Sequence, residues 1–263
     1  AGVVFSTSFD SFFQPSWGPG NLLHEGDVLK LKLDYVSGAG FQSKSMYLYG
    51  NVCVRMKLVD GDSAGTVTAF YMSSDGTRHN EFDFEFLGNT TGQPYLVQTN
   101  LYIKGIGNRE ERLNLWFDPT KDFHWYGIVW NHRHVLFLVD DVPVRVHTNS
   151  ETVAYPDEQP MRIYSSIWNA DEWATQGGRV KTDWSHAPFI TAYSGFEIDA
   201  CEWQSRESVG ECANEKKMWW DSELSIHQIH QLMWVRANHL VYNYCQDNER
   251  FSVLPPECIR RGH

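Results

Sequence analysis

The sequence contains no run of about 18 apolar residues, the length that a membrane-spanning helix needs. It is also poor in basic residues, with 22 Lys and Arg against 33 Asp and Glu and a net charge of −11. Nucleic acids, anionic lipids and anionic polysaccharides bind basic surfaces, so this composition argues against all of them as partners. No glycine-rich phosphate loop and no Ser/His/Asp arrangement stands out, and we predict neither a cofactor nor a metal. These absences favour a neutral partner.

Cysteine is scarce as well, and its five residues are unevenly placed. Four lie in the last quarter of the chain, at Cys201, Cys212, Cys245 and Cys258, whereas Cys53 stands alone in a strand-like stretch. Four cysteines permit three pairings, and the sequence does not choose between them. Closure of short loops favours Cys201 with Cys212 and Cys245 with Cys258. Cys53 is expected to be a buried free thiol.

Three features predict that the protein is secreted. Paired cysteines imply an oxidising compartment. The triplet Asn89-Thr90-Thr91 is an acceptor sequence for glycosylation of Asn89. The chain starts at Ala1 without a basic or apolar leader, as a mature form whose signal peptide has been removed would.

Aromatic residues, in contrast, are abundant, with 11 Trp, 12 Tyr and 15 Phe. Aromatic rings fill hydrophobic cores, which is one explanation of their number. Exposed Trp and Tyr also stack on the flat apolar face of sugar rings, which is the other explanation. A neutral carbohydrate is therefore a suitable partner.

From Val3 to Ala200 the sequence consists of short alternating or apolar runs that Gly, Asp, Asn and Pro interrupt. Asp140-Asp141 lies between two β-branched runs and predicts a tight hairpin turn. Many strands at regular spacing, with no helical pattern between them, indicate one all-β domain built as an antiparallel sandwich or barrel. The predicted strands are Val28–Leu33, Asn51–Leu58, Thr66–Met72, Phe82–Phe86, Val97–Tyr102, Tyr126–Trp130, Val135–Val139, Val142–Val146 and Met161–Ile167.

Beyond Cys201 the apolar residues change to helical spacing. Ser222 to about Ala237 predict one amphipathic helix, flanked by the two cysteine loops. We expect residues 201–263 to pack on the sandwich of residues 1–200 as an extension rather than as a second domain.

The strongest chemical signal is the strictly alternating segment Glu81-Phe82-Asp83-Phe84-Glu85-Phe86. On a strand its acids share one face while its phenylalanines enter the core. Carboxylates on one face repel each other and have poor β propensity, so the arrangement needs a compensating role. A solvated edge strand is one alternative. A Ca²⁺ site with His79 is another, but same-face residues lie about 6.5–7 Å apart, which spreads the ligands instead of caging an ion.

Glycoside hydrolysis explains the pattern better. A retaining enzyme needs two carboxyl groups about 5–5.5 Å apart, one as nucleophile and one as acid/base. The Cα atoms of Glu81 and Glu85 would lie about 13 Å apart on an extended strand, so the strand must curve and the side chains must lean inward. Asp83 can hydrogen-bond Glu81, and mutual repulsion raises one pKa and keeps that acid protonated. These residues alone do not say which Glu has which role.

Further segments accompany the acids. They are Gly61-Asp62-Ser63-Ala64-Gly65-Thr66-Val67-Thr68-Ala69-Phe70-Tyr71, Val97-Gln98-Thr99-Asn100, Asn108-Arg109-Glu110, Leu115-Trp116-Phe117-Asp118-Pro119, Tyr164-Ser165-Ser166-Ile167-Trp168-Asn169-Ala170, Trp173-Ala174-Thr175-Gln176-Gly177-Gly178, Tyr242-Asn243-Tyr244-Cys245 and Pro255-Pro256-Glu257-Cys258. Together they resemble the plant xyloglucan endotransglucosylase/hydrolase family along nearly the whole chain. The resemblance implies an antiparallel β-sandwich (jelly roll) with a concave substrate cleft and a helical, disulfide-stapled C-terminal extension.

The resemblance also implies roles for individual residues. Glu81 would be the nucleophile, Asp83 its helper and Glu85 the acid/base that protonates the departing chain. The positions that match the acceptor side of the family's cleft are Trp168, Trp173, Ala174, Gly178 and Arg250. The other expected substrate-binding residues are Tyr71, His79, Gln98, Thr99, Asn100, Asn108, Arg109 and Glu110.

The family contains transferases and hydrolases, and its hydrolytic branch carries an extended loop beside the acceptor residues. Asn169-Ala170-Asp171-Glu172-Trp173 shows no such insertion. A site that orients the acceptor raises its effective concentration to about 10⁵–10⁸ M, far above that of water. We therefore expect a monomeric endo-transglucosylase of the cell wall (apoplast). It would cleave a β-1,4-glucan, xyloglucan, and transfer the fragment to the non-reducing end of another xyloglucan chain.

Three alternatives stay open. Thr148 to Pro160 is shorter than usual for the family, and Trp17-Gly18-Pro19-Gly20-Asn21 departs from it at the presumed donor end. A hetero-transglucanase that uses mixed-linkage glucan or cellulose as donor is therefore one alternative. A predominantly hydrolytic xyloglucanase is the second. A non-catalytic glucan-binding jelly roll is the third, although it would not need three acids in one row.

Overall fold

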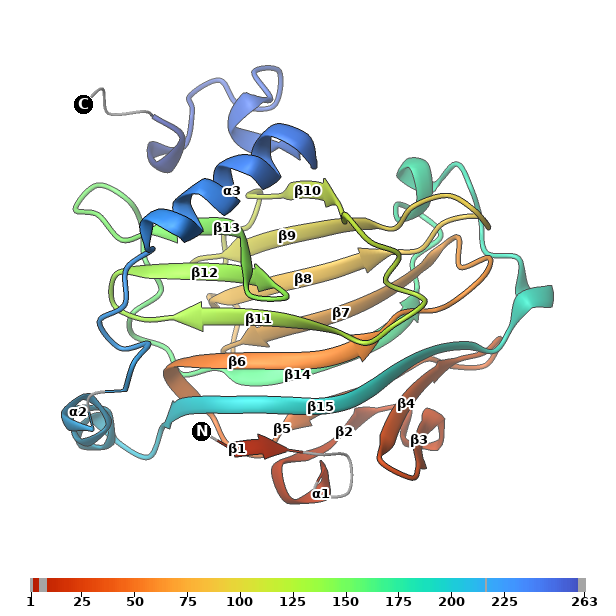
Figure 1. Ribbon diagram of the computed structural model, residues 1–263, viewed down its shortest axis with the longest axis horizontal. Helices are drawn as coiled ribbons and strands as arrows, with labels where there is room; N and C mark the ends of the chain where they lie inside the picture. The colour runs from red at the N-terminus through yellow and green to blue at the C-terminus, as the bar shows by residue number, and fades with distance from the viewer. Residues whose placement is uncertain (1, 5–8, 216, 260–263) are drawn as a thin grey trace.

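A computed structural model describes residues 2–4, 9–215 and 217–259 as two antiparallel β-sheets that pack face to face (Figure 1). We call the sheet that carries the acid row the cleft sheet, and the other the support sheet. The expected all-β antiparallel sandwich is confirmed. In spatial order the cleft sheet contains β16 (Leu240–Asn243), β10 (Glu111–Asn114), β9 (Leu96–Tyr102), β8 (Glu81–Leu87), β7 (Thr66–Ser73), β14 (Arg162–Asn169), β5 (Ala39–Ser43) and β2 (Phe13–Trp17). The support sheet contains β13 (Val142–Thr148), β12 (His134–Val139), β11 (His124–Trp130), β6 (Tyr47–Lys57), β15 (Phe189–Glu202), β4 (Val28–Leu33) and β3 (Leu22–Glu25), and β1 (Gly2–Val4) pairs with β15.

Every predicted strand is present, with boundaries that differ by a few residues. Several strands had no usable pattern in the sequence. β10 and β16 are four residues long, and Pro15 and Gly40 interrupt β2 and β5. β15 is the longest strand, but its register shifts between Tyr193 and Gly195, which breaks the alternation. The regular strands were therefore predictable and the irregular or short ones were not.

The hairpin at Asp140-Asp141 is confirmed between β12 and β13. Both aspartates have positive φ, 47° and 62°, as the two central residues of a type I′ turn do. The Asp140 carboxylate accepts hydrogen bonds from the backbone N–H of Trp125 at 2.9 Å and from Nδ1 of His124 at 2.6 Å. These contacts fasten the turn to the start of the neighbouring strand β11.

The helices lie outside the two sheets (Figure 1). They are α1 (Phe9–Phe12), α2 (Arg206–Asn214) and α3 (Ile226–Asn238). α3 is the predicted helix, but it begins four residues later than expected, because Ser225 and Gln228 form a capping box there. α2 was not predicted, since it is short and has only three apolar residues, Val209, Cys212 and Ala213. No helix among the described residues is both long and apolar enough to cross a membrane.

The C-terminal extension does more than pack on the sandwich. Its strand β16 pairs with β10 and forms an edge of the cleft sheet. The disulfides Cys201–Cys212 and Cys245–Cys258 are both present, which confirms the pairing favoured by loop length. Cys53 is free, as expected, and half-buried rather than buried. Burial and the charge of Glu197 raise the pKa of its thiol to about 12.

Aromatic rings fill the space between the sheets. The ring of Phe84 on β8 lies 5.3 Å from that of Phe137 and 6.0 Å from that of Tyr126, both on the support sheet, at steep angles. Edge-to-face pairs of this kind add stability beyond the area they bury. Part of the unusual aromatic content is therefore core packing.

Replacing Phe84 by Ala should lower the free energy of unfolding by about 3–5 kcal/mol, because the ring is fully buried and its loss leaves a cavity between the sheets. Denaturant titration followed by tryptophan fluorescence would measure the change. Val36→Ala is the control, since Val36 is 91% exposed and its truncation should leave the midpoint nearly unchanged. Equal effects of the two substitutions would contradict the packing argument.

Candidate active site

Strand β8 lies in the middle of the cleft sheet, between β7 and β9. Phe82, Phe84 and Phe86 are fully buried between the sheets. Glu81, Asp83 and Glu85 point to the opposite side and line a cleft together. The predicted separation of the segment into an acid face and a core face is confirmed.

The cleft has a volume of about 610 Å³. Its lining runs from the edge strand β2, with Trp17, across the centre of the sheet to β10, with Arg112. Trp17 at one end and Trp173 beyond β14 are 40% and 37% exposed, which leaves their faces available for stacking on sugars. The lining residues are Trp17, Ala69, Tyr71, Glu81, Asp83, Glu85, Gln98, Asn100, Tyr102, Glu110, Arg112, Ser166, Trp168 and Trp173.

Strand pairing places one continuous row of residues across the cleft sheet at the level of Glu85. In order they are Trp17, Gly40, Ser166, Ala69, Glu85, Gln98, Arg112 and Tyr242. On one side of Glu85 the row consists of small residues and ends at Trp17. A Cβ on Gly40 would lie only 2.4 Å from Nε1 of Trp17, so the ring rests directly on this glycine. The small residues make a shallow floor on which an extended chain of sugar rings can lie.

Asp83 is the most buried of the three acids, at 7% exposure. Burial raises its pKa well above the usual range, and the charges of Glu81 and Glu85 raise it further. A hydrogen bond to Glu81 acts in the same direction. The raised pKa favours the protonated form of Asp83, in which it can donate a hydrogen bond to the Glu81 carboxylate.

Glu85 has a raised pKa for a similar reason. Burial is the largest cause, and the charges of Glu81 and Glu110 add to it. Gln98 acts in the opposite direction, since its Nε2 donates a hydrogen bond to Oε2 of Glu85 at 2.6 Å. Arg112 in turn donates from Nε to Oε1 of Gln98 at 2.7 Å. Because arginine has no acceptor, this bond fixes which end of the Gln98 amide faces the acid.

Six of the thirteen expected substrate-binding residues line the cleft, and three more lie next to it. Tyr71, Gln98, Asn100, Glu110, Trp168 and Trp173 line the cleft. His79 lies beside it, with Nε2 3.7 Å from Oε2 of Glu81 and its ring stacked on Tyr102. Asn108 and Arg250 lie behind Glu110: Arg250 donates to Oδ1 of Asn108 at 3.0 Å and forms an ion pair with Glu110 at 2.7 Å.

Four of the expected residues contribute no side chain to the lining, and the expectation is corrected for Thr99, Ala174 and Arg109. Thr99 is fully buried on the core side of β9, because alternation along the strand turns it away from its cleft-facing neighbours. Ala174 is buried in a small apolar cluster with Val67 and Leu87. Gly178 has no side chain and positive φ, and a Cβ there would collide with the backbone of Glu172. The Arg109 side chain is 11% exposed and pairs with Glu257 instead of lining the cleft.

Five lining residues were not predicted as site residues: Trp17, Ala69, Tyr102, Arg112 and Ser166. Four of them lie directly opposite an acid or one strand further along the same row. Pairing the predicted strands around β8 would have identified Ala69 and Tyr102. Arg112 and Ser166 additionally require the strand order, which the sequence does not give.

The fold and the acid row define a jelly-roll protein of the glycoside hydrolase class. Residues 9–186 match the family model described as Glycosyl hydrolases family 16. Residues 213–258 match the model described as Xyloglucan endo-transglycosylase (XET) C-terminus. Among solved structures the chain resembles a Bacillus licheniformis β-glucanase, with 25% identity and a TM-score of 0.60 over 72% of this chain and 92% of that one.

Relatives of known sequence narrow the class. The chain is 63% identical over its whole length to Xyloglucan endotransglucosylase protein 6 of Diospyros kaki, of which it covers 92%. It is 59% identical over 99% of its length to Xyloglucan endotransglucosylase/hydrolase protein 9 of Arabidopsis thaliana, of which it also covers 92%. The chain belongs to the xyloglucan endotransglucosylase/hydrolase family.

Replacing Gln98 by Leu should move the basic limb of the pH profile of kcat/KM to higher pH and lower its maximum. The Gln98 amide stabilises the carboxylate form of Glu85, so its loss raises the pKa of Glu85 and the acid stays protonated to higher pH. Transfer rates with a glucan donor would be measured across the pH range. Gln204→Leu, an exposed position, is the control. A limb that stays in place or moves to lower pH would contradict this role of Gln98.

Proposed function

We propose that this chain is a retaining endo-transglucosylase that cuts the β-1,4-glucan backbone of xyloglucan and re-joins it to another xyloglucan chain. The observation that carries the proposal is the acid row itself: a buried central carboxyl with a raised pKa lies between two glutamates, and all three line an open cleft. The names of the relatives support the substrate and the transfer reaction.

In the first step the Glu81 carboxylate attacks the anomeric carbon of a backbone glucose, and the glycosidic C–O bond breaks. Glu85 gives its proton to the departing oxygen, which is the proton that its raised pKa retains. Asp83 donates a hydrogen bond to Glu81 and so fixes the direction of attack. The result is a glycosyl-enzyme ester on Glu81 and a free leaving chain.

In the second step a sugar hydroxyl of the acceptor gives its proton to the Glu85 carboxylate and attacks the same carbon, releasing Glu81. Transfer requires that this hydroxyl compete with water, so an acceptor must be held by stacking and hydrogen bonds. Trp173 supports this role, because the short loop before it leaves its ring exposed beside the cleft. Trp17, at the far end of the row of small residues that starts beside Glu85, is suited to hold the donor.

The location, oligomeric state and glycosylation of the protein are inferred from the same family. We propose that the protein is secreted, acts in the cell wall as a monomer and carries a glycan on Asn89. The two disulfides support an oxidising compartment. Residues 1–200 would form the catalytic jelly roll, and residues 201–263 the extension that adds β16 to it.

The reaction is tested by incubating the protein with xyloglucan, with and without a fluorescent xyloglucan oligosaccharide. We expect label to enter the polymer with few new reducing ends, because the acceptor should resolve the intermediate faster than water. Polymer size and reducing ends are followed together. A steady rise of reducing ends in the presence of acceptor would identify a hydrolase and contradict the argument from the short loop. If neither signal changes, mixed-linkage glucan and cellulose are tested as donors.

Glu81→Ala should reduce turnover by at least about 10⁴-fold while leaving oligosaccharide binding in place, because it removes the nucleophile but not the cleft. Transfer assays give kcat, and isothermal titration gives the dissociation constant. Glu158→Ala, at an exposed position, is the control and should behave as the unmodified protein. Turnover within tenfold of that protein would place the nucleophile on another residue.

A further inference from the structure

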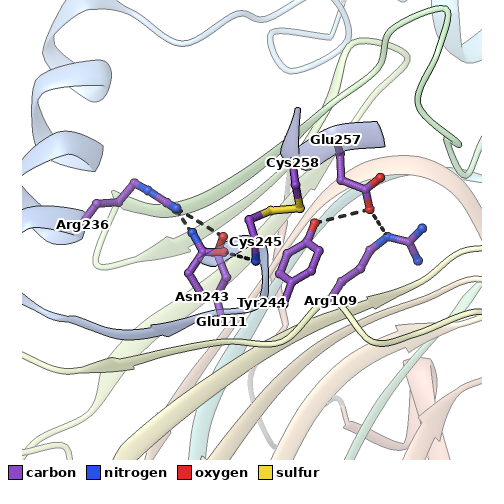
Figure 2. The surroundings of a disulfide bond; sticks show 8 residues. All are labelled: Arg109, Glu111, Arg236, Asn243, Tyr244, Cys245, Glu257 and Cys258. Atoms are coloured by element: carbon purple, nitrogen blue, oxygen red, sulfur yellow. Dashed lines mark hydrogen bonds and ion pairs between the residues drawn. A yellow bond between two sulfur atoms is a disulfide. The ribbon is translucent and has the colours of Figure 1, made fainter. Parts of the chain in front are cut away.

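The segment Asn108-Arg109-Glu110-Glu111, which leads into β10, is held by the C-terminal extension at each of its charged residues. Arg109 pairs with Glu257 (Nε to Oε1, 2.5 Å), Glu110 with Arg250 (2.7 Å) and Glu111 with Arg236 (3.0 Å). Figure 2 shows the first and last of these pairs on either side of the disulfide Cys245–Cys258. All three partners come from a stretch far away in the sequence.

The pair of Arg109 and Glu257 is the most enclosed of the three. The two side chains are 11% and 9% exposed, so the pair differs from ordinary surface ion pairs, which contribute little. Burial alone would raise the pKa of Glu257, but its own backbone N–H and Arg109 hold it below the usual range, so the carboxyl is charged. Removing one partner of such a pair leaves the other buried and uncompensated.

Arg109 connects this pair to the loop before β10. Its Nη1 donates to the carbonyl oxygens of Ile106 at 2.6 Å and Gly107 at 3.3 Å. Its backbone N–H donates to Oδ1 of Asn100 at 3.1 Å. The preceding Asn108 has a positive φ of 62°, a conformation that the surrounding contacts must hold in place.

Two residues touched by this arrangement face the substrate. Asn100 on β9 and Glu110 beside β10 both line the cleft, on the opposite side of β8 from Trp17, so a donor held at Trp17 leaves this side to the acceptor. An amide and a carboxylate at hydrogen-bonding distance from a sugar chain can fix the orientation of its hydroxyls. If the Arg109 loop shifts, the adjacent Glu110 moves with it, and the Asn100 oxygen loses one of the two backbone N–H donors that hold it, the other being that of Leu101. A shift of about 1 Å is enough to impair a reaction that depends on orientation.

We propose that Glu257 is a positioning residue for the acceptor glucan: from the disulfide-bound turn Pro256–Cys258 it holds Arg109, and through it the Asn100 amide and the Glu110 carboxylate. This inference rests on the proposed transferase function. The proposal also gives Arg109, which the sequence predicts as a substrate-binding residue, a role outside the cleft. The turn Pro256–Cys258 is itself anchored by the disulfide of Cys258 with Cys245. Cys245 lies two residues beyond the end of β16, the edge strand of the cleft sheet.

The test compares Glu257→Ala with Glu249→Ala. Glu249 lies in the same disulfide-closed loop, is exposed, and forms no ion pair with any residue that the structure describes. We expect Glu257→Ala to raise the KM for the xyloglucan oligosaccharide acceptor about tenfold, within the range of coupling between contacting residues. The KM for donor and the release of reducing ends without acceptor should stay within twofold of the unmodified protein. Circular dichroism melting identifies any loss of folding, and Glu257→Gln, which keeps the volume, replaces the variant if it unfolds.

A double-mutant cycle tests whether Glu257 acts through Arg109. If it does, Glu257→Ala should add almost nothing in an Arg109→Met background. An unchanged acceptor KM, an equal rise of donor and acceptor KM, or fully additive effects would each overturn the proposal. Failure of the proposed function is recognised separately, because the unmodified protein would then transfer no label in the same assay.

Discussion

The structure depends on the two-sided character of strand β8. Its phenylalanines fill the space between the sheets, and the same alternation forces its acids onto the cleft face. A slip of one residue would bury three carboxyl groups and expose three aromatic rings, so the hydrophobic core fixes the register of the acids. The energy of the core is thus what holds the reacting groups in place. The concentration of negative charge on one face is a consequence that the rest of the site must accommodate.

The accommodation uses protons and hydrogen bonds, and His79 lies beside the row with Nε2 3.7 Å from Oε2 of Glu81. The raised pKa of Asp83 favours its protonated form, which lowers the charge of the row. Below the sheet the buried Arg145 donates to the backbone oxygen and Oγ1 of Thr99 and lowers the pKa of Asp83, but burial and the neighbouring acids have the larger effect. Gln98 and Arg112 act on Glu85 from the next two strands. These contacts give the carboxyl groups of one row different environments, as the proposed division into acid and nucleophile requires.

A feature of the fold or the site could be predicted from the sequence when the interactions that determine it are between residues close together in the chain. The acid face, the regular strands and the Asp140-Asp141 turn follow from neighbours in the chain, and all of them were predictable. Thr99 obeys the same local rule, since alternation along β9 turns it to the core side while Gln98 and Asn100 face the cleft. Ser166, Arg112 and Trp17 join the site only through strand order, which no local pattern contains.

The edge of the cleft sheet shows how a long-range contact can change the role of a residue. By its sequence neighbours Arg109 belongs with the cleft residues, yet its guanidinium points to Glu257, which lies 148 positions further along the chain. A short strand such as β10 has few ladder hydrogen bonds of its own, and β16 and the three ion pairs supply what it lacks. The extension thereby stabilises this edge of the cleft sheet, which has few hydrogen bonds of its own. Residues that never touch the glucan can thus determine how well the acceptor is oriented.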